Sequence, residues 1–468
     1  MTFTALFDKA VGESCRLTEL FKPTHCAVVI AMKRLVLWMN GERVGAWTVA
    51  QGKDQLQYDD RWLQSPQARP LSLTLPFTPG NQPHRGEQVG AWFDNLLPDS
   101  QRLRDRIATR FKTKGKSTFD LLAEVGRDSV GAIRLLPESL SPKEAPDDVR
   151  SITAQAMNEA EVAQLLRSTA STGPGDALHA DDFRISLAGA QEKTALLQIN
   201  GQWMRPLGAT PTTHILKLPL GLVGNLQMDM ATSVENEWLC AQIIKAYGLP
   251  VANCTMVQFE DIKALAVERF DRAWSADRSW LIRLPQEDMC QALGYPSHQK
   301  YESDGGPGMD KILNLLSGST QAVQDKSNFI KAQFLFWLLR ASDGHAKNFS
   351  IHIKAGGSFA MTPVYDVLSV YPVLGEGPKL VSPHKVSMAM AVRGKNAHYK
   401  MRDIQPRHWR ELAKRHGIAP EGAGSPFEQV IAQTSAVIEK VQGLLPEGFP
   451  LQVSDAILNG LAEAAREF

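Results

Sequence analysis

The chain has 468 residues, which is long for a single compact core, so two or more lobes are expected. Its composition, 43% hydrophobic and 22% charged, is that of an ordinary globular protein. A net charge of +1 excludes a whole-molecule attraction to nucleic acid or membranes, so any such binding must come from a local patch.

Apolar runs and cysteines limit the cellular setting. No apolar run approaches the roughly 20 residues that span a bilayer, so no membrane association is expected. The first apolar run, "CAVVIA", is short and late for a secretory signal. The five cysteines are scattered and contain no CxxC pair, which argues against a disulfide framework or a zinc site. Together these features predict a cytoplasmic protein.

The first part of the chain divides into an extension and a small domain. Residues 1–31 do not share the strand pattern that begins at Met32 and are expected to be a loosely ordered extension. The string "MKRLVLWMNGERVGAW", from Met32, predicts two strands joined by an Asn40-Gly41 turn. An N-terminal subdomain is therefore predicted over 32–136. Residues 137–151, rich in proline, serine and charge, predict a linker.

The middle of the chain, 152–290, is rich in strand patterns. "THILKLP" alternates, with Ile215 and Lys217 on one face. "SVENEWLCAQIIKAYG" predicts a helix capped by Ser233 and ended by Gly248. "ALAVERFDR" predicts an apolar strand that becomes polar at Glu268.

Helices dominate the last part, 291–468. "NFIKAQFLFWLLR" is apolar almost all round and predicts a buried helix. A strand-rich half followed by a helical half is the order of a two-lobed, nucleotide-dependent phosphotransferase. The predicted fold class is therefore α+β, a two-lobed protein-kinase-like fold with a strand-rich N-terminal lobe and a helical C-terminal lobe.

The buried helix is followed by "DGHAKN", residues 343–348, which concentrates polar groups. A metal-dependent hydrolase, a phosphotransferase or a plain helix end could each use this cluster. Asn348 lies five residues after Asp343, which is the spacing of the D-x-x-x-x-N catalytic loop of kinases. Asp366 lies eighteen residues beyond Asn348, at the end of strand-like "MTPVYD", where a Mg²⁺ ligand would be placed. Together the three residues favour phosphoryl transfer.

His345 is the strongest hint of a hydrolase. A zinc hydrolase needs several histidine or carboxylate ligands, and the remaining histidines form no HxxxH or HxH pattern. We interpret His345 as a residue that orders the loop, with metal ligation as the lesser alternative.

Three upstream features complete the predicted nucleotide site. Lys217 is the expected phosphate contact, and a buried lysine needs a carboxylate, for which Glu237 is favoured over Glu235. "LAGAQEK", residues 187–193, offers a glycine and small residues whose backbone N–H groups could approach phosphates. The segment from Glu268 to Phe270 ends a strand, where a kinase presents backbone groups to adenine.

Several strings together resemble the HipA family of bacterial serine/threonine kinase toxins. They are "RPLSLTLP", "FDNLLPDS", "FDLLAEVGRDSVGA", "FRISLAGAQEKTALL", "PTTHILKLP", "LAVERFDR", "RLPQEDMCQALGYPSHQKYESDGGPG", "SDGHAKNFS" and "TPVYDVLS". The resemblance runs from about Met32 to the C-terminus and is densest from 183 to 372. Only residues 1–31 fall outside it.

The resemblance implies ATP- and Mg²⁺-dependent phosphorylation of a protein serine. Asp343 is then the catalytic residue, Asn348 and Asp366 bind Mg²⁺, and Lys217 binds ATP. The other residues expected to contact the nucleotide are Ala188, Gly189, Ala190, Gln191, Glu192, Lys193, Glu268, Arg269, Phe270, His345, Ala346, Lys347 and Tyr365.

The resemblance also implies regulation and partners. The serine matching Ser186 is an autophosphorylation site whose modification switches the kinase off. Family toxins are neutralised by a dimeric helix-turn-helix antitoxin of HipB type, act in growth arrest and persistence, and bind operator DNA with it. The substrate of similar members is an aminoacyl-tRNA synthetase, glutamyl-tRNA synthetase.

One stretch is basic although the whole chain is neutral. Between 379 and 415 there are ten lysines and arginines against two acidic residues. The stretch is either a solvated face or a phosphate-contacting surface for DNA or tRNA. The candidate DNA contacts are Lys379, Lys385, Arg393, Lys395, Lys400 and Arg402. Two other functions stay open: a DNA-binding co-repressor in which kinase activity is secondary, and a kinase of small molecules or lipids.

Overall fold

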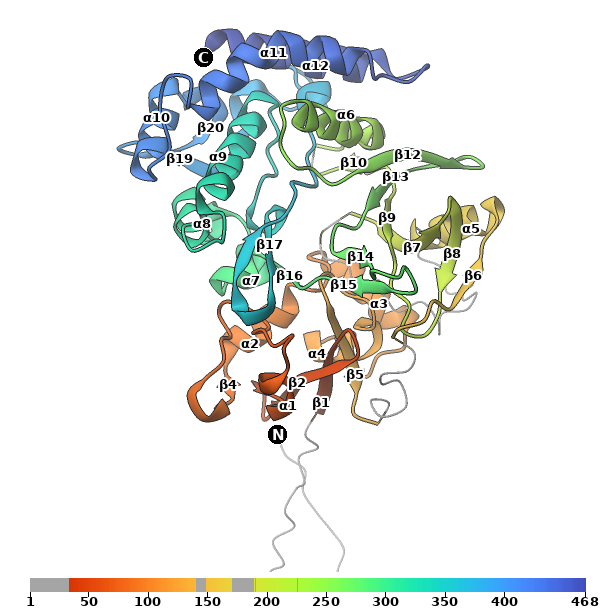
Figure 1. Ribbon diagram of the computed structural model, residues 1–468. Helices are drawn as coiled ribbons and strands as arrows, with labels where there is room; N and C mark the ends of the chain where they lie inside the picture. The colour runs from red at the N-terminus through yellow and green to blue at the C-terminus, as the bar shows by residue number, and fades with distance from the viewer. Residues whose placement is uncertain (1–32, 140–148, 171–188, 190, 225) are drawn as a thin grey trace, which may run out of the picture.

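A computed structural model of the protein describes residues 33–139, 149–170, 189, 191–224 and 226–468. Three parts succeed one another along the chain (Figure 1): a small N-terminal domain, a six-stranded sheet and a helical lobe. Each part is the main source of one of three hydrophobic cores. Residues 1–31 and most of the predicted linker lie outside the described residues, and the predicted domain boundaries stay predictions.

The N-terminal domain is a five-stranded sheet, in the order β4-β3-β2-β1-β5, with four helices. The predicted hairpin is present: β1 (Lys33–Met39) and β2 (Glu42–Ala50) are joined at Asn40 and Gly41, whose φ angles of 47° and 91° suit the twist of the two strands. The other elements are β3 (Lys53–Tyr58), β4 (His84–Arg85), β5 (Ile133–Pro137), α1 (Asp60–Gln64), α2 (Glu87–Asp94), α3 (Gln101–Arg110) and α4 (Thr118–Val125).

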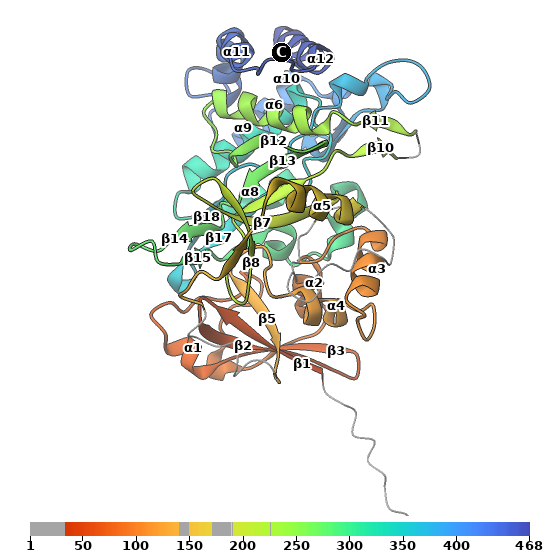
Figure 2. The same cartoon turned by 90° about the vertical axis from the view of Figure 1, so that its right-hand side faces the viewer.

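The second part is a sheet in the order β12-β13-β9-β7-β8-β6. Its strands are β6 (Ala154–Ala156), β7 (Lys193–Ile199), β8 (Gln202–Pro206), β9 (His214–Lys217), β12 (Cys254–Phe259) and β13 (Ile262–Glu268). Helix α5 (Glu159–Ala170) lies beside this sheet (Figure 2). Two small antiparallel pairs flank it, β10 (Gly221–Val223) with β11 (Met228–Met230) and β14 (Arg272–Trp274) with β15 (Leu281–Arg283).

Helix α6 (Ser233–Ala246) connects the sheet to the helical lobe. Its buried side chains, including Leu239 and Ile243, belong to the core of that lobe. The predicted cap is wrong by one residue: Thr232 is the N-cap residue, and the Ser233 hydroxyl instead accepts a hydrogen bond from the backbone N–H of Leu220. The Ser233 hydroxyl therefore binds the backbone of the segment before the helix and does not cap the first turn of the helix.

The third part contains six helices among its described residues. They are α7 (Met289–Leu293), α8 (Met309–Leu316), α9 (Ala322–Leu338), α10 (Pro406–Arg415), α11 (Pro426–Gln442) and α12 (Leu451–Glu467). The predicted buried helix is α9, whose Phe334 packs against Trp409, Phe427 and Phe468. Within the described ranges, no helix is both long and apolar enough to cross a membrane.

The predicted order of a strand-rich half and a helical half is confirmed. The helical lobe nevertheless carries strands that the sequence analysis did not assign. They are β16 (Gln286–Asp288), β17 (Ser350–Ile353), β18 (Phe359–Met361), β19 (Ser387–Arg393) and β20 (Ala397–Lys400). The β17–β18 hairpin spans the distance in sequence between Asn348 and Asp366.

A buried charge network joins the N-terminal domain to the sheet. Asp128 contacts three arginines, with 2.8 Å to Arg272, 3.2 Å to Arg283 and 3.3 Å to Arg269. Asp271 contacts Arg269 at 2.8 Å and accepts a hydrogen bond from the backbone N–H of Gly131. The arginine side chains are 1–2% exposed. Since unpaired buried charges are costly, each contact depends on the others.

The same domain also contacts the helical lobe. Glu287 accepts hydrogen bonds from the backbone N–H of Leu73 and from the indole of Trp92. The Gln291 side chain donates to the carbonyl of Trp92, and Asn95 donates to the carbonyl of Tyr295. The N-terminal domain thus lies against both of the other parts.

We predict that Asp128→Ala destabilises the protein by about 3–5 kcal/mol, because three buried arginines then lose a shared carboxylate. The free energy of unfolding would be measured by urea denaturation. Asp261→Ala is the matched control, since Asp261 also pairs with an arginine, Arg167, but both side chains are exposed. A surface pair contributes about 0–1 kcal/mol. Equal losses in the two variants would contradict the importance of the network.

Candidate active site

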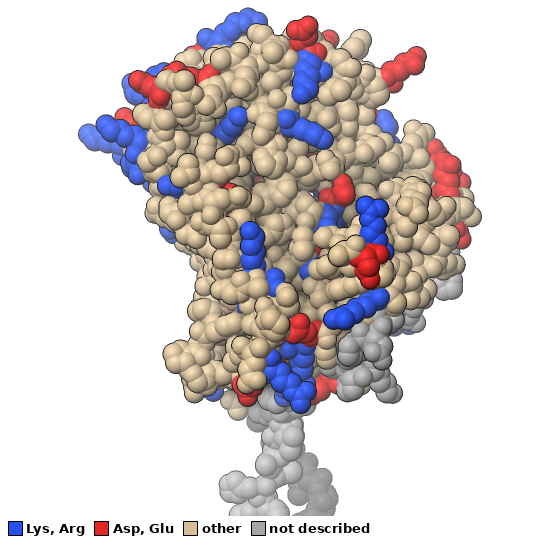
Figure 3. Space-filling model, viewed as in Figure 1, with Lys and Arg blue, Asp and Glu red and all other residues tan. Residues whose placement is uncertain are grey.

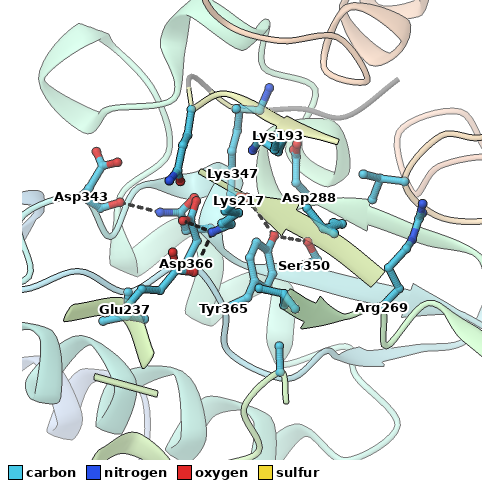
Figure 4. A pocket seen from close by; sticks show the side chains of 18 of the residues that line it. Lys193, Lys217, Glu237, Arg269, Asp288, Asp343, Lys347, Ser350, Tyr365 and Asp366 are labelled. Atoms are coloured by element: carbon cyan, nitrogen blue, oxygen red, sulfur yellow. Dashed lines mark hydrogen bonds and ion pairs between the residues drawn. The ribbon is translucent and has the colours of Figure 1, made fainter. Parts of the chain in front are cut away.

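A cavity of about 350 Å³ lies where the three parts meet. Its wall includes Ile215 from β9, Val251 before β12, Asp366 after β18 and Asn95 from the N-terminal domain. Figure 4 shows the labelled side chains that converge on it. The predicted residues Lys217, Asp343, Asn348 and Asp366, which are far apart in the sequence, all line this one cavity.

Lys217 lies at the centre of the charged groups. Strand β9 pairs with β7 and β13, which places Lys217 opposite Lys193 and Leu265. Its Nζ lies 2.6 Å from Glu237 Oε1 and 2.6 Å from Asp366 Oδ1 (Figure 4). The predicted pair with Glu237 is present, whereas Glu235 pairs with Lys263. Burial lowers the pKa of Lys217, but the two carboxylates outweigh it and raise the pKa above its usual value.

The loop after α9 is closed by its own side chains. The chain reverses at Arg340, which has a φ of 51°, and the Asn348 amide then donates to the carbonyl of Asp343 at 2.7 Å. This bond spans the five-residue spacing of the predicted catalytic loop. Gly344 is required here, because a Cβ at this position would lie 2.4 Å from the ring of Phe336.

Asp343 faces the mouth of the cavity, with its side chain 57% exposed. The hydroxyl of Tyr301 donates a hydrogen bond to Asp343 Oδ1. His345 packs edge-on against the Tyr301 ring at 5.0 Å, and its Nε2 lies 3.9 Å from the same carboxylate oxygen. Burial lowers the pKa of His345, which favours the neutral imidazole. The carboxylate can accept a hydrogen bond from a hydroxyl group at this place, as the bond from Tyr301 shows.

Asp366 and Asn348 provide the oxygen atoms suited to Mg²⁺. Burial raises the pKa of Asp366, but Lys217 and Lys193 outweigh it and lower the pKa, so the carboxylate is ionised. Asp366 has a φ of 60°, a left-handed conformation that Asp tolerates better than most residues and that is common at functional sites. The bond from the Asn348 nitrogen leaves its Oδ1 oxygen for another partner. Carboxylate and amide oxygens, completed by phosphate oxygens, suit Mg²⁺.

No purely protein-based metal centre is present among the described residues, since no group of three or more His, Cys, Asp or Glu is arranged to hold a metal. A Mg²⁺ ion here would depend on phosphate oxygens and water to complete its ligands.

The Tyr365 side chain connects the loop 343–348 to the start of strand β17. The Tyr365 hydroxyl donates to the carbonyl of Lys347 at 2.8 Å and lies 2.6 Å from the Ser350 hydroxyl (Figure 4). Ala346 is fully buried in the 3₁₀ turn Ala346–Asn348. Tyr365, a predicted cofactor contact, therefore also holds the loop 343–348 in place through its hydrogen bond to the carbonyl of Lys347.

The predicted nucleotide loop is described only in part. Ser186, Ala188 and Ala190 lie outside the described residues. Gly189 has a φ of 104°, and a Cβ there would lie 2.5 Å from Lys193 Nζ. Gln191 donates to the carbonyl of Leu218, and Glu192 pairs with Arg106 of α3.

Residues Glu268, Arg269 and Phe270 line the cavity, but the backbone N–H groups of the first two already have partners within the protein. The backbone N–H of Glu268 is bonded to the carbonyl of Asn253, and that of Arg269 to the carbonyl of Thr213. The Arg269 side chain belongs to the buried network and is 1% exposed. Adenine recognition by this segment stays a prediction, and Arg269 already has a structural role.

Sequence reasoning missed several groups in the cavity wall. Asn95 and Asp99 come from the N-terminal domain, and Asp288 and Lys300 from the start of the helical lobe. Burial raises the pKa of Asp288 to about 6. The available signal was that Asn95 and Asp99 fall within "FDNLLPDS" and Asp288 and Lys300 within "RLPQEDMCQALGYPSHQKYE", strings that had pointed only to the family.

The basic stretch is partly neutralised in the folded chain. Figure 3 shows lysine and arginine side chains at the left edge, over α10 and the β19–β20 hairpin. Arg393 pairs with Glu302, and Arg415 lies 3.4 Å from Asp310. Both of these acidic residues lie outside the basic stretch. Five of the six candidate DNA contacts are exposed: Lys379, Lys385, Lys395, Lys400 and Arg402. The positive charge at this surface is thus smaller than the count of residues 379–415 implies. Contact with DNA stays a prediction.

Comparisons with known proteins agree with this geometry. Residues 35–136 match the family described as the HipA N-terminal domain, and residues 185–439 the HipA-like C-terminal domain. The putative kinase Y4mE of Sinorhizobium fredii is 30% identical over 443 residues, which are 93% of this chain and 97% of that protein. The serine/threonine-protein kinase toxin HipA of Shewanella oneidensis is 29% identical over 333 residues, which are 67% of this chain and 70% of that protein.

A solved structure of similar fold is HipA of Shewanella oneidensis in complex with HipB and operator DNA. It superposes with a TM-score of 0.74 at 22% identity, over 93% of this chain and 97% of that chain. The predicted two-lobed, kinase-like fold is confirmed by this match.

We predict that the affinity for Mg²⁺-ATP falls between about pH 7 and pH 9. Burial, reinforced by the charge of Lys217, lowers the pKa of Lys193 to about 8. Above that pH Lys193 loses the positive charge that would attract phosphates, whereas Lys217 keeps its charge. Calorimetric titration with a non-hydrolysable ATP analogue would measure the effect. Lys193→Met should bind more weakly at pH 7 and lose this pH dependence, and a flat wild-type profile would contradict the assignment.

Proposed function

This chain belongs to the HipA family of kinases, and we propose that it transfers the terminal phosphate of ATP, with Mg²⁺, to a serine or threonine of a protein. The observation that carries the proposal is the convergence of Lys217, Asp343 and Asp366 on one cavity. A cation for the phosphates, a carboxylate for the acceptor hydroxyl and a metal-binding carboxylate are the parts that phosphoryl transfer requires.

In the proposed reaction, the acceptor hydroxyl oxygen forms a bond to the terminal phosphorus of ATP. The bond from that phosphorus to the bridging oxygen breaks, ADP leaves, and the hydroxyl proton passes to the Asp343 carboxylate. The acceptor thus takes the place that the Tyr301 hydroxyl holds at Asp343. Lys217 remains paired with Glu237 and orients the phosphates. Asn348 and Asp366 would hold Mg²⁺, which supplies positive charge beside the phosphate oxygens.

We further propose the biological setting of a toxin of the HipBA type. The Shewanella oneidensis structure is a complex of HipA with HipB and operator DNA. By analogy, this chain would bind a HipB-type helix-turn-helix antitoxin and reach operator DNA through it. The proposed acceptor protein is an aminoacyl-tRNA synthetase, and glutamyl-tRNA synthetase is the favoured candidate. Phosphorylation of this enzyme would cause growth arrest and persistence.

We predict that Asp343→Asn abolishes phosphate transfer but retains affinity for Mg²⁺-ATP, because an amide cannot accept the hydroxyl proton. Removal of a general base costs typically 10²–10⁴-fold in rate. Transfer of labelled phosphate to purified glutamyl-tRNA synthetase and to the protein itself would be measured beside ATP-analogue affinity. Asp455→Asn, at an exposed position of α12, is the control and should behave as wild type. Wild-type rates in the Asp343→Asn variant would reject the proposed role.

We also predict that incubation with Mg²⁺-ATP adds one phosphate to Ser186 and inactivates the protein. A phosphate of about −2 charge beside the nucleotide loop would repel the phosphates of ATP. Mass spectrometry and ATP affinity would be followed over time. Ser186→Ala should bind ATP and keep its activity, and loss of activity with Ser186 unmodified would rule out this switch.

A further inference from the structure

The N-terminal domain contributes a carboxylate to the wall of the cavity. Asp99 lies after α2 in the segment 95–99, and Asn95, Leu96 and Asp99 line the cavity. Asp99 Oδ1 lies 2.7 Å from Lys347 Nζ, and Oδ2 lies 2.9 Å from Lys300 Nζ. The side chain of Lys347 is 4% exposed and that of Asp99 13%. Asp99 therefore pairs with two ammonium groups at a position that is largely shielded from solvent.

The charges explain why both lysines depend on Asp99. Burial raises the pKa of Asp99, but Lys347 and Lys300 outweigh it and lower the pKa to about 2, so the carboxylate is ionised at any physiological pH. Among the described residues, Asp99 is the only carboxylate within ion-pair distance of Lys347. Without that anion, two neighbouring cations would repel each other inside the cavity.

Backbone contacts of the same segment reach the nucleotide loop. The carbonyl of Asn95 accepts a hydrogen bond from Lys347 Nζ at 3.3 Å. The backbone N–H of Asp99 donates to the carbonyl of Gly189 at 3.2 Å, and Pro98 forms a parallel bridge with Gly189. One segment therefore contacts both a lysine of the loop 343–348 and the backbone of the loop before β7.

We propose that Asp99 is a positioning residue for phosphoryl transfer, acting through Lys347. A lysine side chain is long and flexible, so its ammonium group is effective only when other groups hold it in place. Asp99 holds the ammonium group of Lys347, which lies on the same loop as Asp343 and Asn348, at the cavity wall, so that the cation is already oriented when phosphates bind. The inference rests on the proposed kinase function and assigns the N-terminal domain a direct part in it.

The first measurement does not depend on activity. Full-length protein would be treated briefly with acetic anhydride, and the acetylation of each lysine quantified by mass spectrometry. Asp99→Asn should increase the labelling of Lys347 several-fold while Lys116 and Lys311 label as in wild type. Asp105→Asn is the matched control: Asp105 also pairs with a lysine, Lys116, but its side chain is 44% exposed. It should leave Lys347 protected. Unchanged labelling of Lys347 in Asp99→Asn overturns the inference, whatever the enzymatic activity.

The second measurement concerns transfer itself, with glutamyl-tRNA synthetase and the protein itself as acceptors. Asp99→Asn should lower kcat about 10-fold or more and change the KM for Mg²⁺-ATP by less than about threefold, as expected when a group is misplaced rather than removed. Asp99→Glu should restore part of the rate. In a Lys347→Met background, Asp99→Asn should have a much smaller further effect on kcat, because the lysine through which Asp99 acts is already gone and only Lys300 remains paired with it.

A purely structural role would give a different result. It would lower kcat by the same factor with or without Lys347, and that outcome, or a kcat within twofold of wild type, overturns the proposal. If wild-type protein transfers no phosphate to either acceptor, the proposed function fails, and the labelling of Lys347 alone then decides whether Asp99 positions it.

Discussion

The protein depends on the pairing of Asp128 and Asp271 with three buried arginines. Charges removed from water cost several kcal/mol each unless partners replace the lost solvation, so none of these side chains is stable alone. The pairing forces a loop of the N-terminal domain against the segment 269–283. That segment continues directly from the strand β13 and the wall of the cavity. The shape of the cavity is therefore set partly by a domain that lies outside the two lobes of the kinase fold.

Buried charges are also paired with opposite charges in the wall of the cavity. Lysines 193, 217, 300 and 347 line it, and an unbalanced group of this kind would be unstable without a bound anion. Glu237 and Asp366 balance Lys217, and Asp99 balances Lys300 and Lys347. These carboxylates hold the ammonium groups of Lys217, Lys300 and Lys347 in place, and the phosphates of a nucleotide can then replace a carboxylate as the partner of a lysine. A site for a strongly negative ligand is in this way stable before the ligand arrives.

The sequence predicted the features that are encoded locally. The Asn40-Gly41 hairpin, the buried helix α9 and the loop from Asp343 to Asn348 could be predicted from turn chemistry, apolar periodicity and spacing. The pair of Lys217 with Glu237 could be predicted too, since a buried lysine needs a carboxylate. The place of Asp99 in the cavity and the contact of Tyr301 with Asp343 could not be predicted, because the strings that contain these residues pointed only to the family. The use of the Arg269 side chain in the buried network depends on Asp128, which is 141 residues earlier.

The long separations in sequence have a consequence for synthesis. Asp99 and Lys347 are 248 residues apart, and Lys217 and Asp366 are 149 apart. At a translation rate of about 5–20 residues per second, roughly 12–50 s pass between the synthesis of Asp99 and that of Lys347. During this time the N-terminal domain can fold on the ribosome, but the cavity lacks the wall that the loop 343–348 provides. A ribosome-bound chain that ends before Asp366 therefore has an incomplete cavity, which closes only when most of the polypeptide has been synthesised.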